Sequence, residues 1–281
     1  MSANGVPTIE LNDGNGIPQL GLGVFKVDAG DTARVVAEAL ELGYRHIDTA
    51  QMYGNEAGVG EAMRGSGLPR DEIFVTSKLN NGNHRPDDAR RSFEETLAAL
   101  GLDHVDLFLI HWPRATQAGD AYVDVWRTLE ELQAEGGARS IGVSNFLVAH
   151  LEKLAEETET VPAVNQVELH PFFQNAEVKA YGEARGIATE AWAPIARGGN
   201  LLEEPAIVKI AASHERTPAQ IVLRWHVERG NIVFPKSARS ERLRENLSLF
   251  DFALEADELA RIDELDEGEP GRTGPHPDAF G

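Results

Sequence analysis

The stretch GYRHIDTAQMYGNEAGVGE, residues 43–61, joins a short strand to a polar loop and a helix. Gly43 can end a preceding helix, and RHID has the apolar pattern of a strand. Asp48 and Tyr53 come at the end of that strand and in the loop beyond it. The ends of parallel strands meet on one rim of an α/β barrel, where residues usually serve chemistry rather than stability. This stretch therefore predicts a barrel strand followed by a catalytic loop.

Polar side chains also end the next two predicted strands. Lys78 ends IFVTSK, and His111 follows VDLFLI. Each of the four groups has a simpler explanation as well. Asp48 could cap a turn, and Tyr53 could be a rim aromatic. Lys78 could be a solvated strand end, and His111 a hydrogen-bonded core histidine. Their joint placement at three consecutive strand ends favours catalysis.

Strand and helix patterns alternate along most of the chain. Predicted strands cover residues 45–48, 73–78, 105–110, 139–143, 164–168, 187–192 and 232–234. Predicted helices cover residues 31–42, 57–64, 123–132, 147–156, 175–185, 217–227 and 240–247, and another begins at Pro86. About eight such units imply an α/β fold, a parallel sheet closed into a (β/α)8 TIM barrel. We expect one domain over residues 1–281.

Both ends of the chain add to this barrel. Residues 8–11 and 17–20 flank NDGNG, whose Asp-Gly and Asn-Gly pairs favour the turn of a β-hairpin. Near the other end, the apolar spacing of residues 259–265 predicts an extra helix. The tail from Glu267 contains too much glycine and proline for regular structure.

An open, doubly wound sheet is the alternative fold, and it would hold a dinucleotide on a glycine-rich loop. The glycine pairs at residues 21–23 and 58–60 are the nearest candidates. Lys26 and Met63 occupy the place of the third glycine. The dinucleotide fingerprint fails twice, so any nucleotide is bound in another way.

The composition excludes several kinds of function. The 281 residues include 46 acidic and 26 basic side chains, a formal net charge of −20, which argues against nucleic acid or an anionic membrane as a general partner. The absence of cysteine excludes disulfides, thiolate metal sites and a cysteine nucleophile. The nine histidines form no His-x-His or HExxH pair, so no metal site is expected.

The sequence also bears on location. MSANGVPTIE lacks the basic region and apolar run of a secretory signal, and no stretch approaches the ~20 apolar residues of a membrane span. We therefore expect a cytoplasmic protein that does not bind membranes, and we expect it to be a monomer.

Three longer motifs, GYRHIDTAQMYGNE, VDLFLIHWP and FPKSARSERLRENL, resemble the aldo-keto reductase family. The resemblance covers nearly the whole chain. The short loop after His111 and the ending GPHPDAF are most similar to the bacterial 2,5-diketo-D-gluconate reductase group. The resemblance implies a barrel whose floor is plugged by the N-terminal hairpin. It also implies an NADP-dependent oxidoreductase that uses NADPH to reduce an aldehyde, an α-dicarbonyl or a keto-sugar to an alcohol.

Carbonyl reduction needs a hydride, which no side chain can donate, and a proton at oxygen. By the resemblance, Tyr53 is the proton donor. Its ordinary pKa of ~10 is too high for easy transfer, and the neighbouring cation Lys78 is expected to lower it by roughly 1 to 3 units. Asp48 is expected to hold Lys78 and keep it charged. The family assigns His111 to orienting the carbonyl oxygen, and a direct acid role stays open.

The second half of the chain contains the cofactor residues that the resemblance implies. Ser144, Asn145 and Gln166 match positions that hold the nicotinamide carboxamide. Trp192 matches the aromatic residue stacked on the nicotinamide ring. Taken singly, each of these residues could simply be a solvated strand end.

Basic side chains cluster around the last predicted strand, which suits a phosphorylated ligand in an otherwise acidic protein. Ser240 is expected to cap the following helix, whose N-terminus would add a positive end for the 2′-phosphate of NADPH. The alternative is a solvated helix whose bases balance its own acids, a contribution of only ~0–1 kcal/mol per pair. The residues expected to contact the phosphate or the adenine are Lys236, Ser237, Arg242, Glu245 and Asn246.

Two departures from the family pattern leave the preferred carbonyl compound open. Asn80 stands where many relatives carry tryptophan, and WAPIA replaces the usual Tyr-Ser-Pro-Leu-Gly. Two other functions also remain open. A Schiff-base aldolase would use Lys78 as its nucleophile, and a nucleotide-sensing subunit would bind NADPH without turnover.

Overall fold

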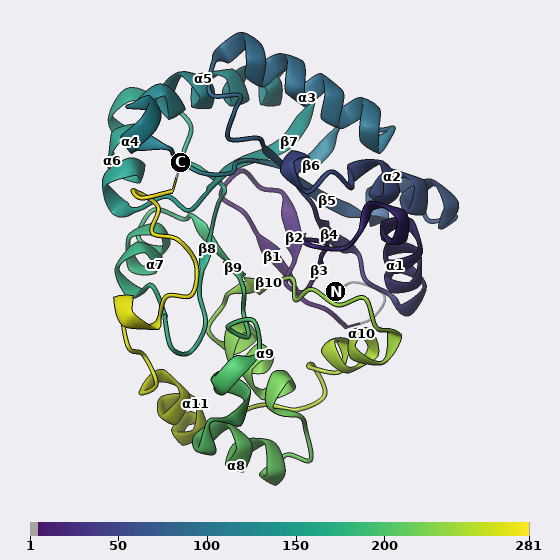
Figure 1. The fold of residues 1–281 in the computed structure, drawn as a ribbon, viewed down its shortest axis with the longest axis vertical. Helices are drawn as coiled ribbons and strands as arrows, with labels where there is room; N and C mark the ends of the chain where they lie inside the picture. The colour runs from purple at the N-terminus through teal and green to yellow at the C-terminus, as the bar shows by residue number, and fades with distance from the viewer. Residues whose placement is uncertain (1–4, 281) are drawn as a thin grey trace.

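The computed structural model describes residues 5–280. Within that part, eight parallel strands form one sheet in the order β10-β9-β8-β7-β6-β5-β4-β3, and helices surround it (Figure 1). The strands are β3 (Leu22–Gly23), β4 (His46–Asp48), β5 (Phe74–Leu79), β6 (Val105–Ile110), β7 (Ala138–Ser144), β8 (Val164–Glu168), β9 (Ala188–Trp192) and β10 (Ile232–Val233).

The two edges of this sheet meet. Leu20 and Val233 form a parallel bridge, and so do Gly23 and Lys236. The amide of Gly21 donates to the carbonyl oxygen of Val233 at 2.8 Å. The sheet is therefore closed on itself, which confirms the predicted (β/α)8 barrel. The expected domain of residues 1–281 includes residues 1–4 and 281, which lie outside the described residues.

Helices follow the strands in the expected order, with ends within a few residues of the predicted ones. They are α1 (Ala29–Leu42), α2 (Glu56–Gly65), α3 (Pro86–Leu100), α5 (Ala121–Ala134), α6 (Val148–Glu157), α7 (Ala176–Glu183), α9 (Pro218–Glu228) and α10 (Ser240–Leu247). The predicted extra helix is α11 (Ala256–Asp263). Among residues 5–280, no helix is long and apolar enough to cross a membrane.

Two further helices were not predicted. The short α4 (Ala115–Ala118) follows β6, and α8 (Pro205–Ser213) lies between β9 and α9. Proline at its first turn starts α8, and its buried face consists of Ile207, Ile210 and Ala211. This spacing is typical of a helix, although no helix was predicted here.

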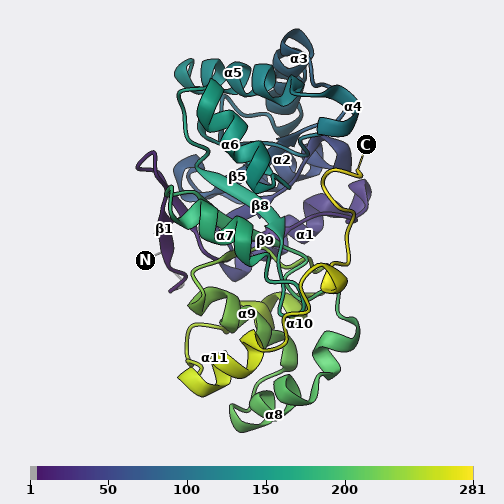
Figure 2. The same ribbon diagram turned by 90° about the vertical axis from the view of Figure 1, so that its left-hand side faces the viewer.

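The interior of the barrel is apolar at its floor. The hairpin strands β1 (Thr8–Glu10) and β2 (Gly16–Pro18) pair antiparallel. Leu11 and Ile17 turn inward, and full burial of a side chain such as Ile17 contributes about 1.5–3 kcal/mol. The buried cluster that they join is Leu11, Ile17, Phe74, Leu107, Leu109, Ala163, Val164 and Ile232. The hairpin therefore plugs the floor, as expected, and Figure 2 shows it on the opposite side of the barrel from the C-terminal tail.

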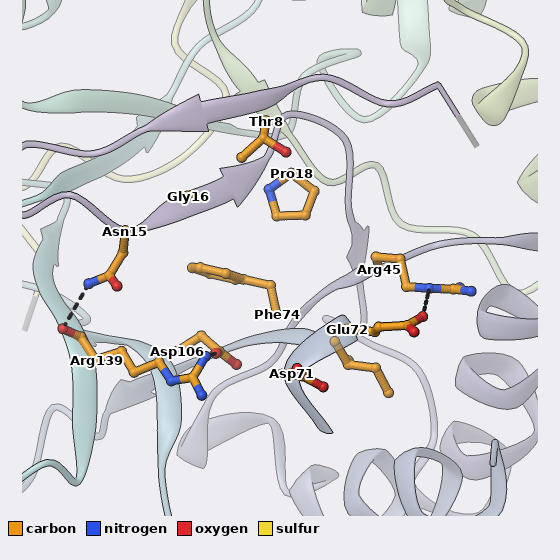
Figure 3. Close-up of a pocket in the computed structure, with 11 residues that line it drawn as sticks. Thr8, Asn15, Gly16, Pro18, Arg45, Asp71, Glu72, Phe74, Asp106 and Arg139 are labelled. Atoms are coloured by element: carbon orange, nitrogen blue, oxygen red, sulfur yellow. Dashed lines mark hydrogen bonds and ion pairs between the residues drawn. The ribbon is translucent and has the colours of Figure 1, made fainter. Parts of the chain in front are cut away.

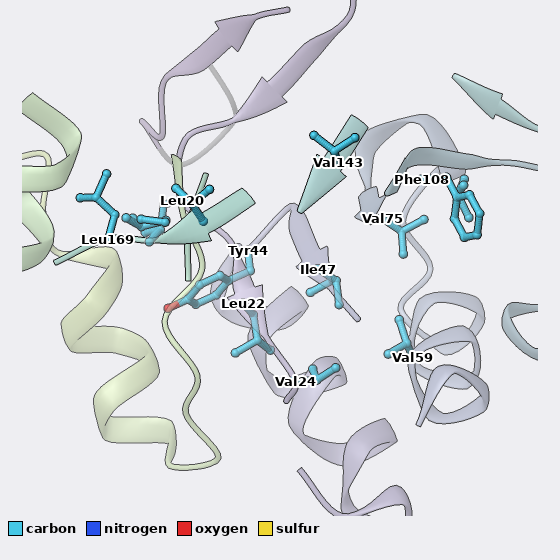
Figure 4. Close-up of a cluster of buried hydrophobic side chains, with 14 of the residues drawn as sticks. Leu20, Leu22, Val24, Tyr44, Ile47, Val59, Val75, Phe108, Val143 and Leu169 are labelled. Carbon is cyan, nitrogen blue, oxygen red and sulfur yellow. The ribbon is translucent and has the colours of Figure 1, made fainter. Parts of the chain in front are cut away.

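A larger apolar cluster lies between the strands and the helices, and Figure 4 shows part of it. Val75 and Phe108 lie on neighbouring strands of this layer, and both are fully buried. Tyr44 adds a polar link, because its hydroxyl donates to the Leu243 carbonyl oxygen of α10 at 3.0 Å. This layer fixes the strands, and so the residues at their ends.

Two details near the C-terminus correct the predictions. The backbone of Arg239 is extended and makes it the N-cap of α10, whereas Ser240 is already the first helical residue. The Ser240 hydroxyl accepts a bond from Arg244 Nη1 at 2.6 Å instead of capping the helix. Helix α11 ends at Asp263, so Leu265 lies beyond it. Between residues 267 and 280, the tail contains a short 3-10 turn, η4 (Glu269–Gly271), and no other helix or strand.

Candidate active site

The four predicted catalytic groups come together at the carboxyl ends of neighbouring strands. Asp48 ends β4, and Tyr53 ends the 3-10 turn η1 (Gln51–Tyr53) that follows it. Lys78 lies near the end of β5, and His111 follows β6. Strand pairing aligns Asp48 with Thr76 of the neighbouring strand β5. Lys78 lies two residues after Thr76, so the side chains of Asp48 and Lys78 are close together.

Lys78 is completely buried and pairs with Asp48. Its Nζ donates to the two Asp48 carboxylate oxygens at 2.7 and 2.8 Å and to the Thr49 carbonyl oxygen at 2.8 Å. Burial lowers the pKa of Lys78, but the negative groups around it, Asp48 foremost, together raise the pKa by more, so the net shift is upward. The expectation that Asp48 keeps Lys78 charged therefore agrees with the geometry.

Tyr53 lies next to this pair, with its hydroxyl 3.4 Å from Lys78 Nζ. Its ring lies 4.9 Å from the ring of Phe25 and 5.8 Å, edge to face, from that of His111. The predicted lowering of the Tyr53 pKa is wrong for the free site. Burial raises the pKa, and the attraction of Lys78 only partly offsets burial and the charge of Asp48. The sequence showed the nearby cation but not the burial of the phenol.

His111 is uncharged in this environment. Burial, reinforced by the charge of Lys78, holds its pKa well below the ordinary value of histidine. Its Nδ1 is buried and has no hydrogen-bond partner within residues 5–280. The side chain is therefore not the hydrogen-bonded core histidine that was the alternative. A neutral imidazole beside Tyr53 can still donate one hydrogen bond to a ligand.

Gln51 fixes the turn that carries Tyr53, and sequence reasoning missed it. Its Nε2 donates to the Ser92 carbonyl oxygen at 2.8 Å and to Thr96 Oγ1 at 3.0 Å. Its Oε1 accepts from the Asn80 amide at 2.7 Å. The turn is thus tied both to α3 and to the loop after β5. Asp48 and Tyr53 were predicted as site residues because their side chains can take part in acid–base chemistry. Gln51 cannot, so no signal in the sequence indicated it.

The residues expected at the nicotinamide form one connected network. Trp192 Nε1 donates to Asn145 Oδ1 at 2.8 Å, and Asn145 Nδ2 donates to Ser144 Oγ at 3.0 Å. Ser144 Oγ in turn donates to the Gln166 carbonyl oxygen at 2.8 Å. Asn145 has a positive φ of 63°, a conformation that asparagine tolerates better than most residues. The network brings all four predicted residues to one side of the catalytic groups.

The cations expected at the phosphate are exposed and unpaired. Lys236 and Arg242 are exposed, as is the neighbouring Arg239, and none of the three has an ion pair within residues 5–280, although most other arginines there do. Ser237 is buried, and its Oγ accepts from the Arg239 amide at 3.1 Å. Free cations beside a hydroxyl fit a phosphate group, so this part of the chain suits the phosphate of NADPH.

The two residues expected at the adenine are less available. The carboxylate of Glu245 accepts a hydrogen bond from the hydroxyl of Thr217, the N-cap of α9. Asn246 is buried, with 7% of its surface exposed. A contact of either residue with adenine therefore stays a prediction.

Comparison with known proteins identifies the family. Residues 14–267 match the sequence profile described as "Aldo/keto reductase family". The chain belongs to this family. Methylglyoxal reductase DkgA of Yersinia pestis is 48% identical over 277 residues, 98% of both chains. The protein of the same name from Escherichia coli K12 is 45% identical over 275 residues, 97% of this chain and 98% of its own.

A solved structure agrees with this assignment. A variant of Gox0644 in complex with NADPH superposes on this aldo/keto reductase with a TM-score of 0.93 and 43% identity, covering 98% of this chain and 99% of that one. The resemblance predicted from the three motifs, including the 2,5-diketo-D-gluconate reductase type, is confirmed.

The C-terminal tail of this aldo/keto reductase is clamped beside the site, which the irregular sequence of the tail did not reveal. Glu168, at the end of β8, accepts bonds from the amides of Thr273 at 2.7 Å and Gly274 at 2.9 Å. A side chain on Gly274 would collide with the ring of Trp192. Further along, the rings of Trp112 and Phe280 lie 4.3 Å apart. The tail therefore covers part of the rim.

A cavity of this aldo/keto reductase lies away from the predicted catalytic groups. It has a volume of about 480 Å³ and lies at the barrel floor, between the hairpin and the starts of β5 and β6 (Figure 3). Arg139 and Asp106, which pair at 3.3 Å, line it together with Phe74. The predicted catalytic groups lie at the opposite strand ends, so this cavity is separate from the chemistry. Among residues 5–280, no group of three or more histidine and acidic side chains could hold a metal ion.

Proposed function

We propose that this aldo/keto reductase uses NADPH to reduce a small aldehyde, α-dicarbonyl or keto-sugar to the alcohol, with Tyr53 as the proton donor. The supporting observation is the position of the Tyr53 hydroxyl, 3.4 Å from the buried ammonium of Lys78. Tyr53 is only partly exposed, at a strand end where a ligand can reach it. Methylglyoxal is one such α-dicarbonyl, and it appears in the name of the similar proteins called methylglyoxal reductase DkgA.

The bound reduced nicotinamide supplies the hydride for the carbonyl carbon. Tyr53 transfers its proton to the carbonyl oxygen, which would otherwise become an unstable alkoxide. The phenolate left behind lies beside Lys78, whose positive charge stabilises it in a site of low dielectric. Asp48 holds Lys78 in place through both carboxylate oxygens. The three residues therefore act as one proton-donating unit.

The raised pKa of Tyr53 suits this role. The phenol keeps its proton through neutral pH and is ready to donate it. Lys78 does not ionise Tyr53 before the substrate reacts. Its positive charge stabilises the negative charge that develops on Tyr53 as the proton leaves. His111 is neutral because burial lowers its pKa, so it is a weak acid and suits a hydrogen bond that orients the carbonyl oxygen.

The preference for NADPH rests on the unpaired cations near the start of α10. Lys236, Ser237 and Arg242 would hold the 2′-phosphate. Ser144, Asn145 and Gln166 would hold the nicotinamide carboxamide, with Trp192 on the ring face. The carboxamide would replace hydrogen bonds that these residues now make within the protein. Few polar groups would then be left without a hydrogen-bond partner when it binds. The NADPH complex of the Gox0644 variant supports the same cofactor.

The geometry disfavours an aldolase. A Schiff-base lysine must be uncharged and reachable. Lys78 is completely buried, and its pKa is raised by Asp48 after the opposing effect of burial. Its three protons already face Asp48 and Thr49. Trapping with borohydride should therefore not attach a carbonyl substrate to Lys78.

We also propose that the enzyme acts as a cytoplasmic monomer whose ligands are the cofactor and a small carbonyl compound. The net charge of −20 supports the absence of nucleic acid and anionic membrane as partners. Light scattering coupled to size-exclusion chromatography tests the monomer, with 30.6 kDa as the expected mass.

The decisive experiment on function is a carbonyl panel. Aldehydes, α-dicarbonyls such as methylglyoxal, and keto-sugars are each mixed with enzyme and NADPH, and the loss of NADPH absorbance is followed. We expect turnover with at least one class and much weaker turnover with NADH. No turnover despite NADPH binding would favour the nucleotide-sensing alternative.

A further inference from the structure

Glu190 is a buried acid within the barrel, in the middle of β9. Its partner in the strand register is Gln166 of β8. Glu190 is completely buried, and Gln166 is 2% exposed. No role was predicted for Glu190 from the sequence. Full burial of a carboxyl group needs a specific explanation.

Gln166 connects Glu190 to the catalytic pair. Its Nε2 donates to Asp48 Oδ2 at 2.9 Å and to Glu190 Oε2 at 2.9 Å. Both protons of the amide are therefore used, one on each carboxyl group.

The charges around Glu190 favour its neutral form. From β4 it faces His46 and Asp48, from β5 it faces Lys78, and on its other side β10 offers only the apolar Ile232 and Val233. The charge of Lys78 is already matched by both oxygens of Asp48. An ionised Glu190 would be a second buried anion without a cation of its own, which is costly.

The remaining contacts of Glu190 fit a carboxylic acid. Its Oε1 has no hydrogen-bond partner within residues 5–280 and lies 3.8 Å from His46 Nε2. His46 Nδ1 lies 3.2 Å from the Pro18 carbonyl oxygen, so Nδ1 carries the proton and Nε2 is the basic nitrogen. Burial raises the pKa of Glu190 to about 8 and lowers that of His46 to about 3. Both groups are thus uncharged at neutral pH.

We propose that Glu190 is a positioning residue: its neutral carboxyl holds the Gln166 amide against Asp48, and its ionisation disturbs the Asp48–Lys78 pair. The kinetic part of this proposal rests on the proposed function. An ionised Glu190 adds negative charge near the place where Tyr53 becomes a phenolate. Reduction should therefore slow when Glu190 loses its proton.

The kinetic test compares Glu190→Gln with the wild type from pH 6.5 to 9.5. Glutamine keeps an acceptor for Gln166 but cannot ionise. The ratio of kcat/KM, variant over wild type, should rise by about three- to tenfold across this range, the effect of one buried charge at moderate distance. Titration of Tyr53 and hydration of the carbonyl substrate are common to both proteins and cancel in the ratio. A flat ratio would overturn the proposal.

A second variant separates positioning from packing. Glu190→Leu removes the acceptor and frees the Gln166 amide, so NADPH should bind roughly five- to tenfold more weakly. Glu190→Gln should recover most of that loss. Equal affinity for NADPH in the leucine and glutamine variants would show that Gln166 does not depend on Glu190, and would also overturn the proposal.

A third measurement needs no turnover. A raised pKa in the fold means that the contribution of Glu190 to stability is present below its unfolded pKa of about 4.3 and is lost as pH rises through about 8. The urea midpoint of Glu190→Gln, relative to that of the wild type, should therefore increase between pH 5 and pH 9. A constant difference would refute a neutral Glu190. Wild-type turnover at pH 6.5 is measured first, because its absence would refute the proposed function and leave these midpoints to decide about Glu190.

Discussion

Lys78 donates to both carboxylate oxygens of Asp48, at 2.7 and 2.8 Å, in a region where Lys78 is fully buried and Asp48 is 2% exposed. Such a pair is weak evidence for stability, because the cost of removing two charges from water offsets their attraction. Its value here lies in holding a cation beside the Tyr53 hydroxyl. Removing one partner should therefore affect stability and turnover differently from removing both.

Lys78→Met should both lower stability and cripple turnover. It leaves Asp48 as an unpaired buried charge, at a cost of about 3–5 kcal/mol, and leaves the Tyr53 phenolate without a cation. In the double variant Lys78→Met/Asp48→Asn, the buried charge is gone, so most of the stability should return. Turnover should not return. Urea unfolding and NADPH oxidation measure the two effects, and recovery of turnover in the double variant would show that Lys78 serves only the fold.

Arg242→Ala should weaken NADPH binding and leave NADH binding nearly unchanged. The two cofactors differ by one 2′-phosphate, and a charge-assisted contact contributes roughly 1.5–3 kcal/mol, or about ten- to 150-fold in affinity. Arg244→Ala is the matched control, since Arg244 lies on the same helix and bonds to Ser240. Fluorescence titration of both cofactors checks this. A similar loss for NADPH and NADH would remove Arg242 from the phosphate site.

Acid should destabilise the protein through His226. This side chain is fully buried, with Nε2 2.9 Å from the Pro194 carbonyl oxygen and Nδ1 3.2 Å from Asn231 Nδ2. Burial lowers its pKa to about 3. The unfolded chain takes up a proton near pH 6.5 and the folded one does not, so stability is present above pH 6.5 and lost as pH falls toward 3.

At pH 5 the loss from His226 is about 2 kcal/mol relative to pH 7. Urea midpoints at these two pH values measure it. His226→Gln should show a smaller difference between them than the wild type. The variant His276→Gln, at a partly exposed position in the tail, should behave like the wild type. If His226→Gln loses as much stability on acidification as the wild type does, His226 does not titrate in the way inferred here.

The barrel and its rim could be predicted because they follow local rules. The periodicity of a strand or a helix can be recognised from residues that are close in sequence. A polar residue at a strand end, such as Lys78, can be recognised because the strand before it is apolar. Gly43 ends α1 in the expected left-handed conformation. These features depend on a few residues at a time, and a family resemblance reinforces them.

The rest depends on contacts distant in sequence. The direction of the Tyr53 pKa shift was wrong because burial is set by residues such as Phe25, from another loop. Ser240 failed as a cap because its hydroxyl accepts from Arg244. Glu190 was missed because its partner Gln166 lies 24 positions away. A sequence pattern shows which polar groups are present, but it does not show which of them are buried away from solvent.

Tyr53→Phe tests the proposed chemistry most directly. It removes the proton donor and keeps the ring beside His111, so kcat for carbonyl reduction should fall by about two to four orders of magnitude. NADPH affinity should stay within a few-fold, since the proposed cofactor contacts lie on other strands. Tyr122→Phe, on the outer helix α5, is the matched control and should keep wild-type turnover. Normal reduction by Tyr53→Phe, with NADPH bound normally, would contradict the assignment of Tyr53 as the donor.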